Sequence, residues 1–114
     1  MQPIAVLIHV PDVELGLSWY QKAFPDAVAE YLGGSKFGTL VLDGFTIEIV
    51  PSDAKVGSGK YGTVLYWSTD NFAKSVKHFE ELDAKIYRGP MQIEGGMSMC
   101  QLEDPFGNLI GLRG

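Results

Sequence analysis

The chain has 114 residues, enough for one globular domain with a real hydrophobic core and too few for two independent domains. Its hydrophobic fraction of 46% and its charged fraction of 20% are those of an ordinary globular protein. The formal charge of −5 argues against a nucleic-acid partner and mildly favours a neutral or cationic ligand, although such acidity also serves simple solubility.

The first half of the chain predicts a strand, a helix and three further strands. Residues 4–10 form a continuous apolar segment that ends at Pro11, and Asp12 is then a natural helix N-cap. Apolar side chains follow at the spacing of one helix face, at Val13, Leu17, Tyr20 and Phe24. Strands are then expected at roughly 27–32, 36–42 and 45–50, with Asp43-Gly44 as a two-residue hairpin turn between the last two.

The second half predicts the same order of elements. A strand at 61–69 is followed by Asp70 or Asn71 as the helix cap. The apolar face of the helix consists of Phe72, Val76, Phe79 and Leu82. Strands are expected near 85–88, 98–102 and 109–113. The turn before the last strand is built from residues that fix or tolerate unusual backbone angles, Asp104-Pro105-Phe106-Gly107-Asn108.

An offset of 59 residues relates the two halves, because it places Asp12 on Asn71 and Tyr20 on Phe79. Within a single domain of residues 1–114, module one covers about 1–52, a glycine-rich linker about 51–60 and module two about 61–114. Each module is β-α-β-β-β, so the fold class is α+β. Since a module this small cannot bury both faces of its sheet, we expect the two to form a curved, mostly antiparallel sheet trough with helices on the convex side.

Other features of the sequence restrict the cellular context. The single cysteine, Cys100, excludes an internal disulfide and a thiolate-rich zinc site, and strand alternation suggests a buried, inert thiol. The N-terminal segment lacks the basic region, apolar stretch and cleavage site of a signal peptide. No apolar run approaches the roughly 20 residues of a membrane span. We therefore expect no membrane partner and, by default, a cytoplasmic location.

Two motifs resemble the vicinal oxygen chelate superfamily, which includes glyoxalase I, bleomycin-resistance proteins and extradiol dioxygenases. Residues Glu103-Asp104-Pro105-Phe106-Gly107-Asn108-Leu109-Ile110 resemble the hairpin near the C-terminus of that family. Residues Val10-Pro11-Asp12-Val13, with Ser18-Trp19-Tyr20, resemble the entry into its first helix. The resemblance covers nearly the whole chain and implies the paired β-α-β-β-β fold. It leaves the function open, because the family contains enzymes and non-catalytic drug-binding proteins.

The resemblance also implies four metal-ligand positions on the concave face. In this chain they fall on Ala5, Glu48, Val64 and Gly111. Only Glu48 offers a donor atom, whereas a catalytic Zn²⁺, Ni²⁺ or Fe²⁺ site needs about three protein ligands. We therefore expect neither a metal at this place nor another cofactor.

Strand alternation from these positions predicts which side chains line the trough. The candidate ligand-binding residues are Leu7, His9, Thr46, Glu48, Tyr66, Ser68 and Arg113. Such a mostly apolar wall with a few polar groups suits a small organic ligand. Glu48 either contacts that ligand or is paired internally with His9, Arg113 or a water molecule, and His9 itself can instead donate to a backbone carbonyl.

Three functions are consistent with this sequence. The first is a metal-free, homodimeric protein of the bleomycin-resistance type that sequesters a small organic compound, which the missing donor atoms favour. The second is a glyoxalase- or dioxygenase-like enzyme in which Glu48 is a general base, alone or with His9. The third is a regulatory or interaction domain without catalysis.

Overall fold

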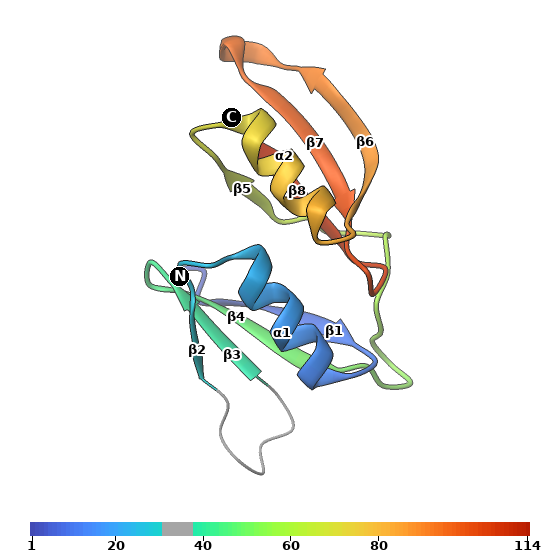
Figure 1. Cartoon of the computed structure of the whole chain (residues 1–114). Coiled ribbons are helices and arrows are strands. Elements are labelled where there is room, and N and C mark those ends of the chain that lie inside the picture. Colours follow the sequence, from blue (N-terminus) through green and yellow to red (C-terminus); the bar gives the residue numbers. More distant parts are fainter. Residues whose placement is uncertain (31–37) are drawn as a thin grey trace. The chain divides into compact units, whose positions relative to one another are not determined.

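The repeat predicted from the sequence is present as two units with the same order of elements (Figure 1). The computed structural model describes residues 1–30 and 38–114. These residues divide into a first unit, Met1–Ser58, and a second unit, Gly59–Gly114. In both, one strand and one helix precede three further strands, which confirms the α+β class predicted from the sequence.

The first unit contains a four-stranded sheet and one helix. Its elements in chain order are β1 (Ala5–Val10), α1 (Val13–Ala23), β2 (Val28–Glu30), β3 (Gly38–Leu42) and β4 (Phe45–Pro51). The strand order is β1-β4-β3-β2, in which β1 runs parallel to β4 and the other neighbours are antiparallel. Asp43 and Gly44 both have positive φ, at 51° and 77°, as the predicted two-residue turn requires.

Helix α1 covers one face of this sheet because its apolar side chains lie on one side. Asp12 caps the helix, since its Oδ1 accepts a hydrogen bond from the Leu15 amide at 3.1 Å. Tyr20 is buried together with strand residues whose side chains share one face, Val10, Leu40, Ile47 and Ile49. Gly16 permits close approach of the helix, because a Cβ there would lie 2.8 Å from a Val10 methyl group.

The second unit repeats this plan. Its elements are β5 (Tyr66–Ser68), α2 (Phe72–Glu81), β6 (Lys85–Gln92), a short 3₁₀ turn η1 (Glu94–Gly96), β7 (Ser98–Glu103) and β8 (Leu109–Arg113). The strand order is β5-β8-β7-β6, again with one parallel pair, β5 and β8. Asn71 caps α2 by accepting a hydrogen bond from the Lys74 amide at 3.1 Å, so the two predicted caps are equivalent. The buried side chains are Phe79, Cys100, Leu102, Ile110 and Leu112.

Two strands differ by more than one residue in extent from those expected. The strand predicted at 61–69 is only Tyr66–Ser68, and Gly62, with a φ of 98°, keeps the first predicted residues from continuing it. The strand predicted at 85–88 continues to Gln92 through two irregularities in its register with β7. Parts of the strands predicted at 27–32 and 36–42 lie outside the described residues. Neither helix in the described part of the chain has the length and apolar character needed to cross a membrane.

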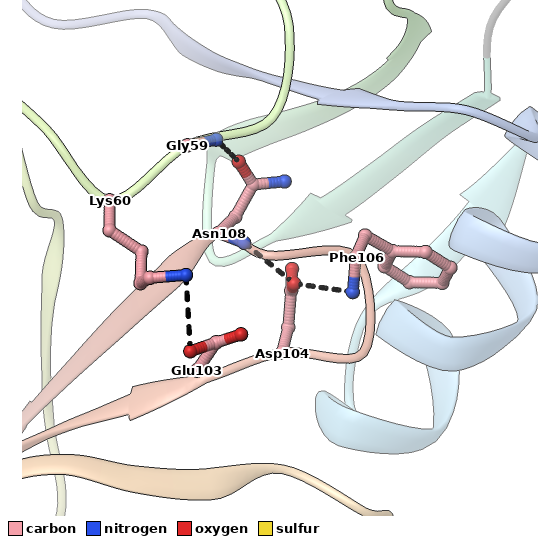
Figure 2. Close-up of polar contacts among 6 residues, drawn as sticks. All are labelled: Gly59, Lys60, Glu103, Asp104, Phe106 and Asn108. Atoms are coloured by element: carbon pink, nitrogen blue, oxygen red, sulfur yellow. Dashed lines mark hydrogen bonds and ion pairs between the residues drawn. The ribbon is translucent and has the colours of Figure 1, made fainter.

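The turn between β7 and β8 is organised around the buried carboxylate of Asp104 (Figure 2). Its Oδ1 accepts hydrogen bonds from the amides of Phe106 and Asn108, both at 2.8 Å. Gly107 supplies the positive φ of 92° that the turn requires. Asn108 Oδ1 in turn accepts a hydrogen bond from the Gly59 amide at 3.1 Å, which fixes the start of the second unit to this turn. The turn that the sequence predicts at these residues is therefore held together by the Asp104 carboxylate.

Asp104→Ala should destabilise the second unit by about 2 kcal/mol, because two turn amides lose their acceptor. Urea denaturation followed by circular dichroism measures this change. Asp53→Ala is the matched control, since Asp53 Oδ1 also accepts two amide hydrogen bonds at 2.8 Å, from Lys55 and Val56, but on an exposed loop. These two amides lower the pKa of Asp53. Asp53→Ala should cost less, because water can hydrogen-bond to the exposed amides that lose their acceptor. Equal destabilisation by the two variants would contradict this explanation.

Cys100 should resist thiol reagents in the folded protein. Its side chain is fully buried, and burial, followed by the charge of Glu80, raises the pKa of the Cys100 thiol from 9.0 to about 11. An unfolded chain therefore ionises near pH 9 while the folded chain keeps its thiol protonated, so stability from this group is present below pH 9 and falls as the pH rises toward 11. Ellman's reagent at pH 8 should react only after denaturant is added, and rapid reaction of native protein would refute this.

Candidate functional site

Each sheet has one face covered by a helix and one helix-free face, and the predicted site residues lie on the helix-free faces. In the first unit, strand register pairs Leu7 with Glu48 and His9 with Val50. Thr46 lies beside Ala5 on the same face. The four candidate residues of the first unit therefore lie on one face of its sheet: Leu7, His9, Thr46 and Glu48.

Glu48 lies at the centre of this face between two neutral neighbours. Leu7 is beside it on β1 and Thr39 is beside it on β3. The side chain is half-buried, and no residue in the described part of the chain forms an ion pair or a side-chain hydrogen bond with it. The alternative of internal pairing with His9 thus has no support within the first unit.

The backbone of His9 is held by the segment that ends the first unit. Ser58 Oγ donates a hydrogen bond to the carbonyl oxygen of His9 at 2.7 Å. The Ser52 amide donates to the neighbouring carbonyl of Val10 at 2.9 Å. The residues after β4 therefore fix the end of β1, where His9 lies.

The second unit brings Tyr66, Ser68 and Arg113 together on its own helix-free face. Register pairs Tyr66 with Gly111 and Ser68 with Arg113. On the next strand Gln101 lies beside Gly111 and Met99 lies beside Arg113. The neighbours of Gln101 along β7, Cys100 and Leu102, point to the opposite, buried face.

The ring of Tyr66 is fixed from three sides. Gln101 Nε2 donates a hydrogen bond to the Tyr66 hydroxyl oxygen at 2.8 Å. The guanidinium carbon of Arg113 lies 5.0 Å from the ring centroid, within the range of a cation–π contact. The third side is Gly111, where a Cβ atom would lie 2.5 Å from the ring. The aromatic ring thus lies directly on the backbone of β8.

Strand register makes Glu48 and Gly111 equivalent in the two modules. The offset of 59 residues places Leu7 on Tyr66. Leu7 pairs with Glu48 in the first sheet, and Tyr66 pairs with Gly111 in the second. The place that holds a carboxylate in one unit is therefore covered by an aromatic ring in the other.

These positions do not fit a resident metal ion. Ala5, Val64 and Gly111 carry no donor atoms, and any side chain at Gly111 would collide with Tyr66. Within the described residues there is no group of three or more His, Cys, Asp or Glu side chains that could hold a metal ion. A lone carboxylate competes poorly with water for a divalent cation.

Two polar residues of this face were not predicted as site residues. Gln101 contacts Tyr66 directly, and Arg88 lies beside Gln101 in the register of β6 and β7. Alternation with the buried Cys100 could have identified Gln101 from the sequence. The sequence alone does not show on which face Arg88 lies, because the register between β6 and β7 shifts on both sides of it.

The chain belongs to the Glyoxalase/Bleomycin resistance protein/Dioxygenase superfamily, whose family model matches residues 4–112. This confirms the resemblance seen in the two sequence motifs. Among curated proteins, none matches the chain.

Solved structures of low sequence identity share the fold. A glyoxalase/bleomycin resistance protein/dioxygenase family enzyme from Burkholderia phytofirmans PsJN is 18% identical, with a TM-score of 0.76, over 96% of this chain and 94% of that one. The fosfomycin resistance protein FosX from Mesorhizobium loti is 15% identical, with a TM-score of 0.74, over 99% and 90%. TioX from Micromonospora sp. ML1 is 12% identical, with a TM-score of 0.73, over 99% and 98%. At these identities the likeness shows the fold alone.

Gly111→Ala should destabilise the protein by about 1–3 kcal/mol, because the new methyl group must displace the Tyr66 ring. The same substitution in a Tyr66→Ala background should cost at least about 1 kcal/mol less, which a double-mutant cycle by urea denaturation measures. Gly59→Ala is the control, since a Cβ there meets no atom within 4 Å and the backbone is not in the left-handed region. Additive effects of Gly111→Ala and Tyr66→Ala would show that the ring does not depend on this glycine.

Proposed function

We propose that this protein is a metal-free member of its superfamily that binds a small organic compound on a helix-free sheet face. The contact between Tyr66 and Gly111 carries the proposal. A family member that used a metal would need a carboxylate at the place of Gly111, whereas here an aromatic ring occupies the space above that backbone.

The residues of the helix-free faces support a binding role. In the first unit Leu7 and Val50 offer apolar surface, and Thr46 and Glu48 offer hydrogen-bonding groups. In the second unit Ser68 offers a hydroxyl group. Tyr66 offers a hydroxyl group, and its ring is already held in place by its neighbours. An apolar surface with a few fixed polar groups is typical of sites for small organic molecules. A side chain that is already held loses little conformational entropy when a ligand contacts it.

A catalytic role for Glu48 receives less support from its surroundings. Removal of a proton next to a carbonyl group creates an oxyanion that needs a metal ion or a cluster of donors for stabilisation. The residues beside Glu48, Leu7 and Thr39, offer a single hydroxyl group. Glu48 therefore serves better as a hydrogen-bond acceptor for a ligand. The homodimer and the cytoplasmic location remain predictions from the sequence.

A thermal-shift screen with anionic, neutral and cationic aromatic compounds and common metabolites tests the proposal. A bound compound should raise the melting temperature by mass action, and the rise should be unchanged by EDTA or by added Zn²⁺ or Ni²⁺. Protein purified without chelator should contain well under one equivalent of transition metal. A stabilisation that EDTA abolishes, with a stoichiometric metal, would sink the proposal.

Glu48→Gln separates binding from catalysis. In a binding protein this variant should change the affinity for a compound found in the screen by about tenfold at most, since it alters one polar contact. Incubation of that compound with the wild-type protein, followed by mass spectrometry, should show no conversion. Glu14→Gln, on the exposed first turn of α1, is the matched control. Turnover that disappears in Glu48→Gln but persists in Glu14→Gln would establish an enzyme instead.

A further inference from the structure

The helix-free face of the second unit concentrates positive charge in an acidic protein. The sequence contains only two arginines, Arg88 and Arg113, against 14 acidic residues. Arg113 pairs in register with Met99 on β7, and Arg88 pairs with Gln101 on the same strand. Because Met99 and Gln101 are two residues apart, both arginines lie on one face of the sheet. Arg113 is on β8, the strand between those of Tyr66 and Gln101, and Arg88 is on β6, beyond Gln101.

Neither arginine is neutralised within the described residues. Both side chains are exposed, and no ion pair joins either to a carboxylate in the described part of the chain. Glu103 is the acidic residue of this face, and its carboxylate already lies 3.3 Å from the Lys60 ammonium group. Lys85 lies beside Glu103 in register and adds another positive charge. Arg88, Arg113, Lys60 and Lys85 thus outnumber one carboxylate on this surface.

The hydrogen-bonding groups of the cluster are also arranged as donors. The Tyr66 hydroxyl oxygen accepts from Gln101, so its own hydrogen can be donated to a further acceptor. Arg113 lies over the Tyr66 ring, which leaves the guanidinium N–H groups at its edge for a carboxylate or phosphate. The Arg88 and Arg113 backbones are about 12 Å apart, because two strand spacings across the sheet combine with two residues along it, and this suits an organic anion better than a small inorganic ion.

We propose that this face of the second unit recognises anions, so that the bound compound is an organic molecule with a carboxylate or phosphate group. The oxyanion pairs with Arg113 and accepts the Tyr66 hydroxyl hydrogen, while Arg88 interacts with the other end of the compound. This inference rests on the proposed binding function and adds the chemical class of the ligand.

Four probes that share a benzene ring test the inference: benzoate, phenylphosphate, benzyl alcohol and benzylammonium. Titrations followed by NMR should shift the side-chain signals of Gln101 and Arg113 with benzoate and phenylphosphate at dissociation constants at least about tenfold below those of the other two probes. The tighter of the two anions identifies a carboxylate or a phosphate as the preferred group. Added salt should weaken the binding of both anions, because it screens their attraction to the arginines.

Variants connect the effect to the named residues. Arg113→Gln should weaken the binding of the anionic probes by at least about tenfold. Arg113→Lys should restore only part of the affinity, because lysine lacks the planar guanidinium group that binds an oxyanion through two N–H groups. Lys74→Gln removes the same charge from the exposed surface of α2 and should change nothing. Circular dichroism checks that each variant is folded.

The possible failures are distinguishable. If benzyl alcohol or benzylammonium binds this face as tightly as benzoate, or if Arg113→Gln has no effect on the anions, the inference is wrong while the proposed binding function stands. If none of the four probes shifts a signal of this face, the inference is wrong, and the thermal-shift screen decides separately whether the binding function stands.

Discussion

The contact between the Tyr66 ring and the backbone of Gly111 is the constraint on which the chemistry of this protein depends. Glycine is required there because any Cβ would lie inside the van der Waals distance of the ring. The ring is then held by Gln101 at its hydroxyl and by Arg113 at its face. One missing side chain therefore both removes a potential metal ligand and creates a rigid aromatic surface. A substitution at Gly111 cannot restore a carboxylate without disturbing the residues that replaced it.

The two modules show how one backbone plan supports different chemistry. Both have the same order of elements, the same caps at Asp12 and Asn71, and one parallel strand pair. The helix-covered faces of both sheets consist mainly of buried apolar side chains. Their helix-free faces differ, because the first centres on a carboxylate at Glu48 and the second on Tyr66. Stability thus comes from the faces that the repeat preserves, and the two units differ in chemistry on the faces that it does not.

The sequence predicted the fold well because the fold depends on periodic patterns and local turns. Helix faces, both caps and the Asp43-Gly44 turn follow from short-range rules, and the structure contains them. The first-unit site residues were placed on one face because uninterrupted strands alternate strictly. Prediction failed where a local irregularity broke that alternation. Gly62 has a positive φ within the strand predicted at 61–69, and the register shifts of β6 hide from the sequence the face on which Arg88 lies. Contacts between strands, such as that of Gln101 with Tyr66, require the register and cannot be read from one strand.

Net charge is a weak guide to the ligand, because a binding surface responds to the charges near it. The chain carries a formal charge of −5, which favours a cation over the protein as a whole. At physiological ionic strength, charges more than about 8 Å apart at the surface are largely screened. In the second unit Asp70, Glu81 and Asp83 are exposed at the ends of α2, whereas both arginines lie on the helix-free face. A ligand over Tyr66 therefore meets a positive surface, and the acidic remainder of the unit acts mainly on solubility.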